Sequence, residues 1–198
     1  MGNVEKDVIR GFRTQDVIYC GLFAALMTVG ALIKIVLPIG AFEVTVSLQV
    51  FFALLAGFLL GARNGFLSIV AYLIIGLIGV PVFAHGGGLG YLIKPTFGFL
   101  IGFAFAALFA GLLTNREKKP RFSRLIVAAL VGEMVYYACG LIYYFIMFNF
   151  VLSATGGIGI AKLFSVWFLS TVIPDTVICM LAAVLAYRLV PIMRKMQG

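Results

Sequence analysis

Long apolar stretches follow one another through most of the 198 residues, and only short polar segments separate them. Hydrophobic residues make up 63% of the chain and charged residues only 11%, which is far from the balance of a soluble domain. A helix of about 20 apolar residues crosses the hydrocarbon core of a bilayer. The chain therefore has room for several membrane-spanning helices, and no soluble catalytic domain fits beside them.

We expect an all-α integral membrane protein with six transmembrane helices. Residues 1–16 would form a cytoplasmic leader, either an interfacial helix or a disordered segment. The membrane domain would cover residues 17–192, and residues 193–198 would be a cytoplasmic tail. The predicted spans are 17–37, 45–60, 66–78, 95–113, 125–151 and 163–189.

The positions of the basic residues predict the orientation. Six spans place both termini on the same side. If that side is the cytoplasm, Lys34, Lys94 and Lys162 lie outside, and the other twelve of the fifteen basic residues lie inside, as the positive-inside rule requires. The net charge of +8 therefore does not indicate a nucleic-acid partner, because the basic residues cluster at the ends of apolar spans.

A glycine-rich stretch at residues 79–98 interrupts the apolar pattern on the predicted outer face. It contains two prolines and His85, the only histidine of the chain. Glycine permits backbone conformations and close approaches that side chains forbid. The stretch is either a flexible loop or a backbone cradle that folds over a small ligand. In the second interpretation, the candidate ligand-binding residues are His85, Gly86, Gly87, Gly88, Gly90, Tyr91 and Lys94.

Two acids lie within predicted spans. An ionisable group in a membrane helix usually faces a cavity or a partner, so Asp175 is a candidate for accepting hydrogen bonds from ligand N–H groups. Its alternative role is to hold two helices together. Glu133 fits a structural ion pair as well as a substrate contact. Lys94, at the end of the glycine-rich stretch, is a candidate partner for a ligand carboxylate.

Helix 17–37 carries Gly21 and Ala25 four residues apart. Small residues at this spacing allow two helices to approach closely in lipid, so the pair fits either internal packing or a docking surface for a second membrane protein. The sequence contains no nucleotide-binding loop and no catalytic or metal-binding motif. We therefore expect no cofactor, no metal and no enzymatic activity.

Three segments of the glycine-rich region, 79–84 (GVPVFA), 86–92 (GGGLGYL) and 95–103 (PTFGFLIGF), resemble the signature of the BioY family. Residues 173–178 (IPDTVI) look like the closing helix of that family. Gly21 and Ala25 stand where these proteins have an Ala-xxx-Ala docking motif. The resemblance extends from about residue 17 to residue 192.

BioY proteins are the biotin-binding S components of energy-coupling factor (ECF) transporters. The resemblance implies a subunit of a bacterial plasma membrane that captures biotin from outside and associates with two ATPases and a transmembrane coupling protein. Ile178 and Leu100 stand where family members often have lysine and arginine, so a biotin analogue or another small vitamin is an alternative ligand. A membrane-embedded enzyme that uses Glu133 and Asp175, and a scaffold subunit without a ligand, are further alternatives.

Overall fold

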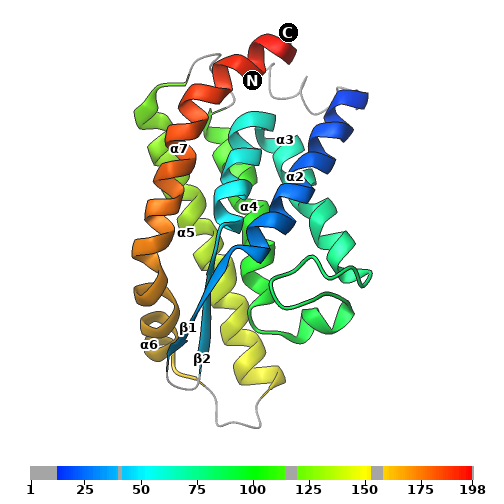
Figure 1. Cartoon of the computed structure of the whole chain (residues 1–198). Helices are drawn as coiled ribbons and strands as arrows, with labels where there is room; N and C mark the ends of the chain where they lie inside the picture. Colours follow the sequence, from blue (N-terminus) through cyan, green and yellow to red (C-terminus); the bar gives the residue numbers. More distant parts are fainter. Residues whose placement is uncertain (1–12, 40–41, 115–119, 153–157, 198) are drawn as a thin grey trace.

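The computed structural model describes residues 13–39, 42–114, 120–152 and 158–197. Five helical segments among them are long and apolar enough to cross a membrane. They pack into a bundle in which the first helix begins and the last one ends at the same end of the molecule (Figure 1). The long helices are α2 (Thr14–Leu32), α3 (Gln49–Leu77), α4 (Phe97–Thr114), α5 (Phe122–Ile146) and α7 (Ser170–Gln197).

Helix α3 covers the second and third predicted spans and reverses direction between them. Gly61 has φ 82° and ψ 176°, a conformation that residues with a Cβ atom rarely adopt. Gln49 and Tyr72 would be about 35 Å apart in a straight helix, yet the Gln49 Nε2 atom lies 2.9 Å from the Tyr72 hydroxyl oxygen. The two arms of α3 therefore lie side by side, and the break predicted between residues 60 and 66 is confirmed.

Residues 34–39 and 42–47 form an antiparallel pair of strands, β1 (Lys34–Ile39) and β2 (Phe42–Ser47). The predictions that helix continues to residue 37 and resumes at residue 45 are therefore wrong. Both strands are rich in β-branched residues, which favour extended backbone. The pairing satisfies backbone groups that would otherwise be unpartnered next to lipid. In Figure 1 this pair extends beyond the ends of α2 and α3.

We call the end of the bundle that carries the start of α2 and the end of α7 the terminal end, and the opposite end the hairpin end (Figure 1). Helix α2 already begins at Thr14, within the predicted leader, and residues 1–12 lie outside the described part. At the terminal end the Asn64 side chain donates a hydrogen bond of 3.0 Å to Asp16. This bond ties the turn of α3 to the first turn of α2.

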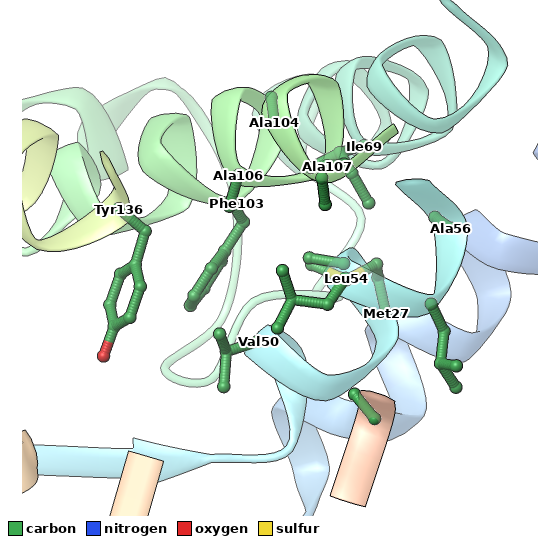
Figure 2. Close-up of a cluster of buried hydrophobic side chains, with 14 of the residues drawn as sticks. Met27, Val50, Leu54, Ala56, Ile69, Phe103, Ala104, Ala106, Ala107 and Tyr136 are labelled. Atoms are coloured by element: carbon green, nitrogen blue, oxygen red, sulfur yellow. The ribbon is translucent and has the colours of Figure 1, made fainter. Parts of the chain in front are cut away.

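The core is built on close contact between α3, α4 and α5. Figure 2 shows that Ala106 and Ala107 of α4 belong to a cluster with Leu54 and Met27. A Cβ atom on Gly57 would lie 2.3 Å from the carbonyl oxygen of Ala107, so α3 and α4 touch through their backbones. Packing of this kind replaces the hydrophobic driving force in lipid.

Towards the hairpin end, α5 continues into a π-helical turn at Met147–Val151. The chain re-enters the bundle through α6 (Ile160–Leu163) and a second π-helical segment, η4 (Phe164–Leu169), which leads directly into α7. The glycine-rich stretch between α3 and α4 contains one short 3₁₀ helix, η1 (Leu89–Ile93). The fifth and sixth predicted spans thus correspond to helical segments 122–151 and 160–195.

Candidate functional site

A cavity of about 300 Å³ lies between β2, the start of α3, the glycine-rich loop, α4, α5 and the η4–α7 segment. This volume is at the lower end of the range for small-molecule sites. Figure 2 includes three of its lining side chains, Val50, Phe103 and Tyr136. Most of the remaining wall is aromatic or polar and consists of Thr45, Ser47, Gln49, His85, Tyr91, Lys94, Thr96, Phe99, Tyr137, Trp167, Thr171 and Asp175.

Asp175 is the acid of this cavity. Its side chain is only 4% exposed. The hydroxyls of Tyr136 and Tyr137 both donate hydrogen bonds to its Oδ2 atom, the second at 2.7 Å. Among the described residues no side chain donates to Oδ1, and a carboxylate oxygen can accept more than one hydrogen bond. Asp175 therefore links α7 to α5 and retains acceptor capacity beside the cavity.

The spacing along the continuous η4–α7 segment sets the geometry of the cavity wall around Asp175. Trp167, Thr171 and Asp175 are four residues apart and thus share one face of the helix, and all three line the cavity. The Thr171 hydroxyl lies 2.6 Å from the Tyr137 hydroxyl and bonds the Trp167 carbonyl at 2.6 Å. π-helical turns are frequent at functional sites, and here one carries Trp167.

Glu133 lies outside the cavity wall. It is fully buried at 0% exposure, and its Oε1 atom accepts a 2.7 Å hydrogen bond from Thr176 of α7. Its Oε2 atom has no hydrogen-bond partner among the described residues. The hypothesis of an acid–base pair requires that Glu133 and Asp175 share one cavity, and Glu133 does not line the cavity that Asp175 lines.

The glycine-rich loop is held by its own backbone. The Phe83 and Gly86 backbones exchange hydrogen bonds of 2.9 and 3.2 Å, and the Gly88 N–H donates to Gly76 at 2.7 Å. Gly86 and Gly88 have φ values of 107° and 95°, which favour glycine. A Cβ atom on Gly87 would lie 2.2 Å from the carbonyl oxygen of Val80. These contacts favour an ordered cradle over a flexible loop.

The predicted site residues of this loop fall into two groups. His85, Tyr91 and Lys94 line the cavity, whereas Gly86, Gly87, Gly88 and Gly90 are not among the lining residues. The glycines fold the chain so that the other three residues meet the cavity. The Lys94 ammonium lies 3.4 Å from the His85 carbonyl oxygen and 4.5 Å from the centre of the Tyr91 ring. Burial raises the pKa of the Tyr91 hydroxyl, so it remains a neutral donor.

Gly21 and Ala25 lie on a strip of α2 that none of the described residues covers. Both are exposed, and a Cβ atom on Gly21 would have no neighbour within 4 Å. Val17 and Leu22 beside them are 60% and 53% exposed. Within the described part of the chain the pair is therefore not used for packing, in contrast to the internal-packing alternative.

Comparison with known proteins agrees with this arrangement. The model of the BioY family matches residues 4–195. A "Probable biotin transporter BioY" of Lysinibacillus sphaericus is 41% identical over 91% of this chain and 89% of its own length. The "Biotin transporter BioY" of Thermotoga maritima is 36% identical over 88% of this chain and 95% of its own length.

A solved structure shares the fold. The crystal structure of an S-component for biotin from an ECF-type ABC transporter superimposes with a TM-score of 0.71 at 25% sequence identity. The match covers 96% of this chain and 94% of the solved one.

Proposed function

The chain belongs to the BioY family, and we propose that it is the substrate-binding S subunit of an ECF-type importer that captures biotin. The observation that carries this proposal is the cavity wall itself, where a buried carboxylate and an ammonium group border one aromatic-lined space. The relatives with the same family assignment are named as transporters, which supports transport over the enzymatic alternative.

The two ends of biotin match these two groups. The ureido ring presents N–H donors, and Asp175 has a carboxylate oxygen that accepts nothing from the described residues. A hydrogen bond between an N–H group and an ionised carboxylate is among the stronger ones in proteins. Lys94 would pair with the carboxylate of the biotin side chain, and the glycine-rich loop would close over the fused rings through His85 and Tyr91, which line the cavity. The aromatic side chains supply the apolar remainder of the wall.

Leu100 favours a second candidate ligand. It lines the cavity at the place where some family members have an arginine, whereas Ile178 is not among the lining residues. Because position 100 is apolar, Lys94 is the one lysine or arginine among the described residues that line the cavity. A biotin analogue or another small vitamin with a weaker anionic group would tolerate this change.

The membrane orientation and the protein partners are part of the same proposal. The two arms of α3 would count as separate crossings, which gives six spans with both termini in the cytoplasm and the hairpin end outside, in a bacterial plasma membrane. The exposed strip with Gly21 and Ala25 would dock the transmembrane coupling protein of a module that also contains two ATPases. Close approach of a second helix is what an uncovered small-residue pair permits.

Isothermal titration of the purified protein with biotin tests the function. We expect saturable heat and an increase in thermal stability at micromolar biotin, because a ligand that binds only the folded state stabilises it. No heat and no stabilisation would contradict biotin as the ligand. Titration with desthiobiotin, lipoate, thiamine and riboflavin in parallel separates the biotin proposal from its alternatives.

A further inference from the structure

A buried relay of hydrogen bonds connects the cavity wall to the glycine-rich loop. The Ser47 hydroxyl donates to Gln49 Oε1 at 3.2 Å, and Gln49 Nε2 donates to the Tyr72 hydroxyl at 2.9 Å. The Tyr72 hydroxyl in turn donates to the Val82 carbonyl at 3.0 Å. Ser47 and Gln49 line the cavity, whereas Tyr72 lies behind it and is 1% exposed.

The direction of this relay is fixed by chemistry. A carbonyl oxygen can only accept, so the single proton of the Tyr72 hydroxyl goes to Val82. Tyr72 must then accept at its oxygen, and the group that it meets on Gln49 must be the NH₂ group. The carboxamide oxygen of Gln49 therefore points to Ser47. Tyr72 thus fixes the orientation of the Gln49 amide in the cavity wall, with the NH₂ group towards Tyr72 and the oxygen towards Ser47.

The other end of the relay fixes the loop. Val82 precedes the turn that Phe83 and Gly86 close with two backbone hydrogen bonds. The Phe83 ring packs on Tyr72 and Tyr91 at centroid distances of 5.4 and 4.6 Å. The residues inside this turn, Ala84 and His85, line the cavity. A shift of Tyr72 would therefore move the part of the loop that meets a ligand.

Besides Lys94 within the loop, side chains from two other elements hold carbonyl groups of the same loop. Lys34 of β1 donates to Ala84, and Tyr143 of α5 donates to Leu92. Both of these side chains are more exposed than Tyr72. Tyr72 differs from them because it is buried and also bonds a side chain of the cavity wall.

We propose that Tyr72 is a positioning residue that couples contact at Gln49 to the position of the glycine-rich loop. A ligand that contacts Gln49 and Ser47 then stabilises the loop in the position seen in the structure through Tyr72, without touching Tyr72 itself. The coupling to ligand rests on the proposed function, because it requires that the ligand occupies this cavity.

The test uses Tyr72→Phe in the full-length protein, with Tyr187→Phe as the matched control. The first variant keeps the ring and removes both hydrogen bonds of the hydroxyl. Tyr187 is 51% exposed on α7 and takes no part in the relay. In the ligand-free protein, we expect faster amide hydrogen exchange at Phe83 and Gly86 in Tyr72→Phe but not in the control. Unchanged exchange at these amides would overturn the proposal.

Dissociation kinetics test the coupling. Loss of these buried hydrogen bonds is expected to speed biotin dissociation about tenfold, with the association rate unchanged. Gln49→Leu combined with Tyr72→Phe should dissociate little faster than either single variant, because both act through one relay. Independent, additive effects would contradict the coupling and indicate two local packing defects.

The two proposals can fail separately. If the unmodified protein does not bind biotin, the proposed function is wrong, and hydrogen exchange in the ligand-free protein still decides whether Tyr72 positions the loop. If biotin binds but Tyr72→Phe leaves either the loop exchange or the dissociation rate unchanged, the inference about Tyr72 is wrong and the function stands.

Discussion

The carboxylate of Asp175 can be replaced by an amide without a change in size. In Asp175→Asn, the amide oxygen can still accept the hydroxyls of Tyr136 and Tyr137, which hold the Oδ2 atom. The NH₂ group then stands at the position of Oδ1. A donor faces the ligand's N–H groups where an ionised acceptor stood before, so the variant keeps the contact between α5 and α7 and loses the contact to the ligand.

The size of the effect follows from the bond that is lost. A hydrogen bond to a charged group contributes about 1.5–3 kcal/mol, which corresponds to a roughly 10- to 150-fold increase in Kd for biotin. Asp175→Ala removes the same bond and also leaves the two tyrosine hydroxyls without their acceptor. We therefore expect this variant to raise the Kd for biotin about tenfold or more. Isothermal titration of the purified variants measures both values.

Glu133→Gln is the matched control for this experiment. Glu133 is also a buried acid between α5 and α7, but it bonds Thr176 and lies outside the cavity wall. We expect Glu133→Gln to bind biotin like the unmodified protein. An unchanged Kd in Asp175→Asn, or equal losses in the two variants, would refute the assignment of Asp175 to the ligand and leave it a helix-linking role.

Three further predictions concern the loop and the docking strip. Lys94→Met should weaken the affinity for biotin by only about threefold, since an exposed ion pair contributes little. A binding assay with biotin amide, which lacks the carboxylate, should find no such loss. An equal loss for both ligands would exclude a contact between Lys94 and the carboxylate. Gly87→Ala should lower the melting temperature, because its Cβ would meet the Val80 carbonyl at 2.2 Å, whereas Gly90→Ala has open space and should not. Gly21→Leu should leave biotin affinity unchanged but reduce co-purification with the ECF module; normal assembly would show that the strip docks nothing.

Hydropathy predicted much of the helical architecture, whereas the orientation predicted from the charges stays a prediction. The apolar segments are helical, and the break at Gly61 lies where a short polar segment separates two of them. The strand pair β1–β2 was missed because its apolar residues continue the hydropathy of the neighbouring helices. The β-branched run around Val36 and the alternation of Val44 and Val46 with polar residues were the available signals.

The candidate site was predicted in part. The cost of an acid within a membrane span made Asp175 a candidate, and the loop composition led to His85, Tyr91 and Lys94, all of which line the cavity. The partners of the acid were not assigned, because adjacent tyrosines in a helix fit interfacial anchoring equally well. Only the packing of α5 against α7 brings Tyr136 and Tyr137 to Asp175. Glycines were predicted at the ligand, whereas the structure uses them to shape the loop.

The most direct test of the central claim is to identify the small molecule that the purified protein carries. Mass spectrometry of the denatured sample should find biotin in near-equimolar amount with the unmodified protein and much less with Asp175→Asn. A different bound vitamin, or equal biotin in both samples, would contradict the account of a biotin-capturing cavity built around this carboxylate.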